Sequence, residues 1–122
     1  MATGNAMETI DPQILADLER DTSRDLIPEL VQLYLDTAAA RAGRMTAALP
    51  DADLAVIASE AHALKSSSAT FGAFEVQRLS LKIENHALEG DAAAVTALMP
   101  ELSRAMAAAN TALRAYVDDL TE

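Results

Sequence analysis

His62 and Lys65 are the two residues of this sequence whose types and spacing point most directly to chemistry. An imidazole is a nucleophile and a proton carrier near neutral pH, and an ammonium group can neutralise an added phosphate. On a helix, residues three positions apart lie one turn apart on the same side. The other helical neighbours of His62 are all small, which leaves room for a second protein to approach the ring: Ala58, Ser59, Ser66 and Ala69.

The segment around His62 has the pattern of a helix. Its apolar stripe follows steps of three and four residues: Leu54, Ile57, Ala61, Leu64, Ser68 and Phe71. At roughly 100° per residue, His62 lies about 130° from the centre of that stripe. We therefore expect the ring to face outward from the folded core.

A short helix and a long helix are expected before this segment. Asp11 as N-cap and Pro12 at the first helical position predict a helix that ends near residues 20–22. Ser23 caps the next helix, which should reach residue 48 or 49. Its apolar positions recur at helical spacing and are Leu26, Leu30, Leu33 and Thr37, with Ile27, Val31 and Tyr34 beside them.

Two further helices are expected after it. The helix of about 74–89 is apolar on two sides and should pack on both, with Val76, Leu79 and Ile83 on one side and Phe74, Leu81 and Leu88 on the other. Asp91 caps the last helix, in which Pro100 predicts a kink or a fresh start. Four long helices with short connections predict an all-α fold, an antiparallel up-down four-helix bundle with an additional short N-terminal helix across one end or side.

Composition sets the class of molecule. The 122 residues suit one domain, which we expect over residues 10–122, with residues 1–9 as a flexible tail. The absence of cysteine excludes disulfides and thiolate metal sites. A formal net charge of −10 argues against nucleic acid and anionic membranes and favours protein partners. With neither a signal peptide nor an apolar span visible, we expect a cytoplasmic protein, and a bundle complete in one chain suggests a monomer.

Residues 61–73 resemble the signature of the histidine-phosphotransfer (HPt) family. They read AHALKSSSATFGA, against a signature of roughly A-H-x-L-K-G-S-S-x-x-x-G-A. The notable departure is Ser66, where the family usually has glycine to leave space beside the ring for an incoming partner. The family fold is a four-helix bundle with an added N-terminal helix, which agrees with the helices expected above.

The resemblance implies a role for each matching residue. His62 is the phospho-accepting histidine, and Lys65 stabilises the phosphate. Ser67 and Ser68 are the small hydroxyl residues, and Gly72 and Ala73 close the motif. We expect a docking patch of small residues around the ring, made of Ala58, Ser59, Ser66, Ser67, Ala69 and Gly72.

Glu84 is a candidate for orienting the imidazole, because family members often have a polar residue on the following helix that contacts the ring. A carboxylate that accepts the Nδ1–H would fix the tautomer and leave Nε2 free to attack phosphorus. A solvated surface carboxylate is the alternative for this residue.

The resemblance implies a carrier that moves a phosphoryl group between receiver-domain aspartates in a multistep phosphorelay. Its partners are response-regulator receiver domains and a hybrid sensor histidine kinase. It needs no cofactor of its own, because the partner receiver supplies Mg²⁺. The sequence has no nucleotide-binding motif, so we expect neither ATP binding nor autokinase activity.

Three other interpretations of these residues have to be considered. A helical module that docks on receivers or kinases without being phosphorylated stays open as the alternative function. A carboxylate-bridged metal site is disfavoured, because Glu60 and His62, like Glu84 and His86, are two residues apart and point to nearly opposite sides of a helix. His86 is expected to be a histidine near a helix end and not a second acceptor.

Overall fold

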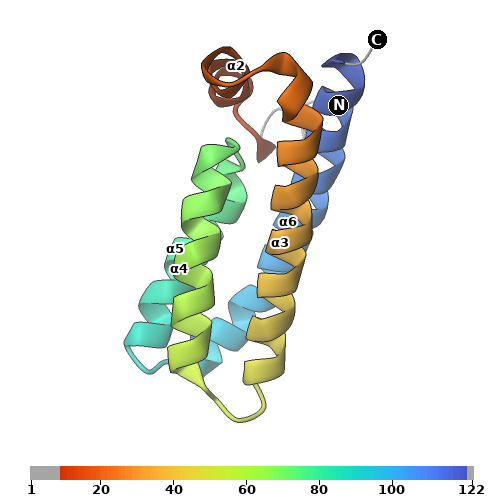
Figure 1. Ribbon diagram of the computed structural model, residues 1–122. Coiled ribbons are helices and arrows are strands. Elements are labelled where there is room, and N and C mark those ends of the chain that lie inside the picture. Colours follow the sequence, from red (N-terminus) through yellow and green to blue (C-terminus); the bar gives the residue numbers. More distant parts are fainter. Residues whose placement is uncertain (1–8, 121–122) are drawn as a thin grey trace, which may run out of the picture.

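The described part of the chain, residues 9–120 of a computed structural model, consists of helices joined by short turns (Figure 1). A short helix and a 3₁₀ turn come first, α2 Pro12–Asp21 and η1 Arg24–Leu26. Four long helices follow, α3 Ile27–Ala48, α4 Leu54–Thr70, α5 Phe74–Leu88 and α6 Ala92–Leu120. They run alternately up and down, and α2 lies across the end where α4 turns into α5 (Figure 1). The predicted four-helix bundle with a short N-terminal helix is confirmed.

Capping side chains set the helix starts. Asp11 and Asp91 each accept a hydrogen bond of 3.0 Å from a backbone N–H of the first turn that follows. Ser23 accepts one of 3.3 Å at the start of η1, and Asp53 one of 3.3 Å at the start of α4. Each cap satisfies a backbone donor that the helix itself leaves unpaired. The predicted caps Asp11 and Asp91 therefore lie at helix starts, whereas Ser23 caps the 3₁₀ turn and α3 itself begins at Ile27.

The core is aliphatic and lies between the four long helices. The predicted stripe of α4 is buried at its centre, at Ile57, Ala61 and Leu64, and α6 contributes the buried residues Val95, Leu102 and Leu113. One buried polar contact ties α3 to α4, where the Tyr34 hydroxyl lies 2.7 Å from Ser68 Oγ. The Tyr34 ring also stacks on Phe71 with centroids 4.9 Å apart. These contacts fix how α4 sits against its neighbour.

Two predicted faces are placed differently. On α3 the core side carries Ile27, Val31, Tyr34, Leu35 and Ala38, whereas Leu33 is exposed, as is Leu26 at the end of η1. On α5 the predicted second packed side is wrong, because Phe74, Leu81 and Leu88 are exposed. Helix α5 packs on α4 and α6 through its other side, and no described helix covers the remainder.

Two smaller expectations also change. No fresh helix begins at Pro100, since α6 runs unbroken from Ala92 to Leu120. The proline ring removes one hydrogen bond to the carbonyl of Thr96, and Thr96 is exposed, so water can satisfy that group. Of the predicted tail, residues 1–8 lie outside the described residues. Thr9 is buried, so the packed chain includes at least this residue.

The turn between α4 and α5 depends on Gly72. Its φ is +70°, in the left-handed region that side chains disfavour. Its carbonyl accepts a hydrogen bond of 2.8 Å from the backbone N–H of Asp11. A Cβ built on Gly72 would lie 2.8 Å from the Asp11 carbonyl oxygen and 3.1 Å from Ile14 Cβ. The same glycine therefore shapes the turn and seats the start of α2.

Gly72→Ala should lower the free energy of unfolding by about 3 kcal/mol, since it adds a backbone clash to the roughly 1–2 kcal/mol of a left-handed alanine. Gly90→Ala is the matched control. Gly90 also has a positive φ, of +79°, but nothing lies within 4 Å of its added Cβ, so a loss of about 1 kcal/mol is expected. Denaturant titration of both variants measures the difference. Equal losses would mean that the contact with α2 contributes nothing.

Candidate functional site

His62 lies midway along α4 with its side chain 63% exposed. Its Nδ1 is 2.7 Å from Glu84 Oε2 on α5. An ionised carboxylate can only accept a hydrogen bond, so the proton between these atoms belongs to Nδ1. In the neutral ring this tautomer leaves the lone pair on Nε2, which is the nitrogen free to attack an electrophile brought from outside.

Glu84 also binds Lys65. The Lys65 ammonium donates to Glu84 Oε1 at 2.7 Å, so the two oxygens of one carboxylate serve two different partners. The hydrogen bond from Lys65 lowers the pKa of Glu84 most, the bond from His62 lowers it further, and partial burial opposes both. Glu84 is therefore ionised at neutral pH. Its side chain is 13% exposed and that of Lys65 25%, so the bridge is largely shielded from water.

The length of the α4–α5 hairpin explains why these residues meet. His62 lies eight positions before Thr70, the last residue of α4, and Glu84 lies ten positions after Phe74, the first residue of α5. The difference of two residues is about 3 Å along the helix axes. In two antiparallel helices that leave one turn, residues equally far from the turn stand at the same height. The tight connection at Gly72 thus places the carboxylate opposite the imidazole. Of the two interpretations left open for Glu84, the structure supports the one beside the ring and not the one in free solvent.

The small residues predicted around His62 differ in their accessibility. Ser59 and Ser66 are exposed, and Ser67 and Ala69 are half-buried. Ala58 is buried at 7% exposure, because it lies on the side of α4 that meets the core, so its assignment to a surface patch is wrong. Gly72 is also buried, beneath the start of α2, and acts through the turn instead of through a surface.

Ser66 stands where the family usually has glycine. Its hydroxyl donates to the His62 backbone carbonyl at 3.2 Å, one turn back along α4. This local bond is typical of serine within a helix and uses the hydroxyl hydrogen within α4. Compared with glycine, Ser66 therefore adds one CH₂ group and one hydroxyl, and that hydroxyl is hydrogen-bonded within α4.

An apolar hollow that the sequence did not predict lies where α2 and α3 meet the C-terminal end of α4. It has a volume of about 450 Å³ and is lined almost wholly by carbon. Its walls include Leu18 from α2, Leu30 and Leu33 from α3, and Thr70 and Phe71 at the end of α4. Helical spacing alone predicts these α3 leucines in the core. The second apolar stripe on α3 could have indicated the hollow. A helix with neighbours on one side buries only one of its two apolar stripes, and the other stays accessible.

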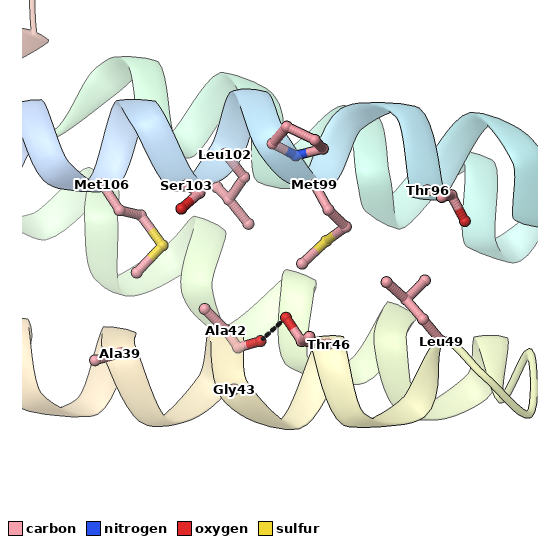
Figure 2. Close-up of a pocket in the computed structure, with 11 residues that line it drawn as sticks. Ala39, Ala42, Gly43, Thr46, Leu49, Thr96, Met99, Leu102, Ser103 and Met106 are labelled. Carbon is pink, nitrogen blue, oxygen red and sulfur yellow. Dashed lines mark hydrogen bonds between the residues drawn. The ribbon is translucent and has the colours of Figure 1, made fainter.

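A second hollow, of about 580 Å³, lies between α3 and α6 (Figure 2). Figure 2 shows Met99, Leu102 and Met106 of α6 facing Ala42 and Thr46 of α3. The small side chains of α3 leave this space open. No residue of α4 or α5 lines it, so it is separate from the site around His62.

His86 lies in the last turn of α5, where Nδ1 is 3.5 Å from Glu89 Oε1, and has no part in the site around His62. Within residues 9–120 there is no group of three His, Cys, Asp or Glu side chains placed to hold a metal ion. Over the same residues, no helix is both long and apolar enough to cross a membrane.

Comparisons with known proteins agree with this geometry. A sequence model of the Hpt domain matches residues 29–121. The phosphorelay protein LuxU of Vibrio vulnificus, in each of two strains, is 30% identical over 86 residues, which cover 70% of this chain and 75% of LuxU. The crystal structure of histidine-containing phosphotransfer protein B (HptB) from Pseudomonas aeruginosa superposes with a TM-score of 0.87 at 22% identity, covering 91% of this chain and 96% of that one.

The family match covers α3 from residue 29 onward and the whole of α4, α5 and α6, which include the segment that carries His62 and the helix that carries Glu84. Hpt phosphorelay proteins interact with receiver domains and kinases. The chain therefore belongs to the Hpt domain family, and its function is histidine phosphotransfer in a phosphorelay.

Proposed function

We propose that His62 is the residue that carries the phosphoryl group, with Lys65 and Glu84 as its partners. The observation that carries the proposal is the bridge in which one ionised carboxylate holds both the Nδ1–H of an exposed imidazole and the ammonium of the neighbouring lysine. It presents Nε2 to solvent in the tautomer that can act as a nucleophile. His86, in the final turn of α5, has only more distant carboxylates, with Nδ1 3.5 Å from Glu89 Oε1 and 3.9 Å from Asp91 Oδ2.

The proposed step is an in-line displacement on the aspartyl phosphate of a docked receiver domain. The Nε2 lone pair of His62 forms the N–P bond as the bond between phosphorus and the aspartyl oxygen breaks, and the receiver's carboxylate leaves with that electron pair. The receiver provides the Mg²⁺ and most of the charge stabilisation, so this chain needs no cofactor of its own. Lys65 adds local neutralisation of the phosphoryl oxygens.

The proposed docking surface joins the exposed residues of α4, namely Ser59, His62 and Ser66, to the apolar hollow. Ser67 and Thr70 at the edge of the hollow follow His62 by five and eight residues, or roughly 7–12 Å along the helix. A standard interface covers about 800 Å² per partner, a disc roughly 30 Å across, so one receiver can span both. An uncovered apolar surface of this kind is typical of a protein-interaction site.

The remaining parts of the proposal concern the setting. The carrier works between the receiver of a hybrid sensor kinase and the receiver of a response regulator. It neither binds ATP nor phosphorylates itself, and it acts as a monomer in the cytoplasm. The net charge of −10 suits protein partners better than nucleic acid.

His62→Gln should abolish phosphoryl uptake and leave the bundle folded, because the ring is exposed and glutamine keeps a polar surface side chain. The test mixes the protein with a hybrid kinase that carries its own receiver domain, radiolabelled ATP and Mg²⁺, and asks whether the label is acid-labile and base-stable. His86→Gln, the matched control, should take up label as the parent does. Unchanged labelling of the His62 variant would overturn the assignment.

Lys65→Ala should slow uptake from a phosphorylated receiver by about tenfold, because a charge-assisted hydrogen bond of roughly 1.4 kcal/mol is lost where the phosphoryl group forms. Single-turnover kinetics measure the rate. Lys82→Ala removes the same charge from α5, where no hydrogen bond joins Lys82 to the site, and should transfer at the parent rate. If the two variants were slowed equally, Lys65 would contribute only net charge.

Leu33→Gln should weaken receiver binding by about tenfold, because it replaces an exposed leucine in the wall of the hollow without disturbing helix propensity. Leu88→Gln is the control, since Leu88 is 71% exposed, against 63% for Leu33, but lies on α5 outside the hollow. Titration of a receiver against each variant gives the affinities. A loss confined to Leu88→Gln would move the docking surface to α5.

A further inference from the structure

Glu84 carries a full negative charge at the ring nitrogen that does not take the phosphoryl group. Orienting the ring needs only a hydrogen-bond acceptor, which a neutral amide would supply equally well. The charge itself is therefore an additional feature. This charge matters for the phosphorylated ring. Whether Nδ1 still carries its proton there decides whether the ring leaves as imidazole or as imidazolate when the phosphoryl group is transferred.

We propose that the Glu84 carboxylate keeps Nδ1 of phosphorylated His62 protonated, so that the ring always departs as neutral imidazole and the carrier gains or loses no proton in either direction of transfer. This inference rests on the proposed role of His62 as acceptor. It deepens that role by assigning Glu84 the control of how readily the phosphoryl group is passed on.

Uptake of the phosphoryl group leaves the ring cationic. Nε2 gives its lone pair to phosphorus, Nδ1 keeps its hydrogen, and the ring becomes an imidazolium. If Nδ1 then lost that proton, cleavage of the N–P bond would expel an imidazolate anion, a poor leaving group. If Nδ1 keeps it, the electron pair of the breaking bond returns to Nε2 and restores the resting tautomer.

The surroundings favour retention of the proton. Glu84 Oε2 lies 2.7 Å from Nδ1, and the carboxylate side chain is 13% exposed, so water competes little for this bond. Of the other charged groups, Lys65 on α4 meets Glu84 through Oε1. The two arginines that α3 brings to α4, Arg41 and Arg44, bind Glu60 instead.

Phosphorylation strengthens this arrangement through Lys65. In the resting site the ammonium shares the carboxylate with the ring. A dianionic phosphoryl group on Nε2 offers Lys65 a second acceptor. When the ammonium turns toward the phosphoryl oxygens, it interacts less with Glu84. The carboxylate then interacts more strongly with the Nδ1–H of the ring. The cation on the ring is then balanced by the carboxylate, and the phosphoryl charge by the lysine.

Glu84→Gln separates charge from geometry, because the amide oxygen can still accept from Nδ1–H. The protein and this variant are loaded with a small phosphoramidate donor, and transfer to one receiver is timed from pH 6 to pH 9. The receiver's own titration cancels in the ratio of the two rates. We expect a ratio near one at pH 6 that rises by about tenfold per pH unit once the variant's ring loses its proton.

Glu75→Gln is the matched control. It removes the same charge from the same helix and breaks the ion pair with Arg78, far from His62. Its rate ratio to the parent should stay flat with pH. A flat ratio for Glu84→Gln as well, with label still bound to His62, would overturn the role of the charge. Absence of label at His62 in the unsubstituted protein would instead overturn the proposed acceptor, so the two failures are distinguishable.

Nitrogen NMR of the unsubstituted phosphoprotein tests the same inference without any variant. At a pH at which free phosphohistidine has lost its ring proton, the Nδ1 signal of phosphorylated His62 should still be that of a protonated nitrogen. A signal that titrates together with the free amino acid derivative would refute the inference.

Discussion

The register of the α4–α5 hairpin is the constraint on which the site depends. A left-handed glycine closes a three-residue connection, and nearly equal lengths of helix on either side bring an imidazole and a carboxylate to about the same height. A one-residue insertion in this turn would rotate α5 by about 100° and carry Glu84 away from the ring. The Gly72 carbonyl in this turn also accepts the hydrogen bond that holds the start of α2. The turn therefore positions both the residues around His62 and the helix that forms one wall of the apolar hollow.

The site is built on the surface of a rigid core, which suits a carrier that must meet partners from outside. His62 stands out from α4 while Ile57, Ala61 and Leu64 on the same helix are buried. The buried Tyr34–Ser68 bond holds the helix against α3. The ring is therefore free to be reached, whereas the backbone beneath it is fixed. An enzyme that excluded water around its nucleophile would need a cleft, and a cleft would prevent two different receiver domains from using the same atom.

The sequence predicted the helices well because each boundary has a local cause. Aspartate caps and the Gly72 turn act over three or four residues, and such signals survive without any knowledge of the tertiary fold. The prediction of which residues are buried was wrong where one helix carries two apolar faces. Which face of α3 is buried depends on where α4 and α6 lie, and α5 kept Phe74, Leu81 and Leu88 exposed because it has neighbours on one side only. Ala58 was wrongly assigned to the surface for a different reason. A small residue occurs both in the core and on the surface, so its type does not indicate which side of the helix it lies on.

The family resemblance suggested a role for Glu84, and the sequence also offers a physical reason for it. Glu84 and His62 lie at nearly equal distances from the turn between their helices. The sharing of its carboxylate with Lys65 could not be predicted, because it depends on two long side chains meeting across helices. That sharing pairs the cation of Lys65 with the anion of Glu84, so neither charge is left unbalanced. If His62 is the acceptor, as proposed, the phosphoryl group meets a single ammonium that already pairs with Glu84, and an ion pair at the protein surface contributes only about 1 kcal/mol. Such weak binding is what reversible transfer requires, since a pocket of several cations would hold the phosphoryl group and stop the relay.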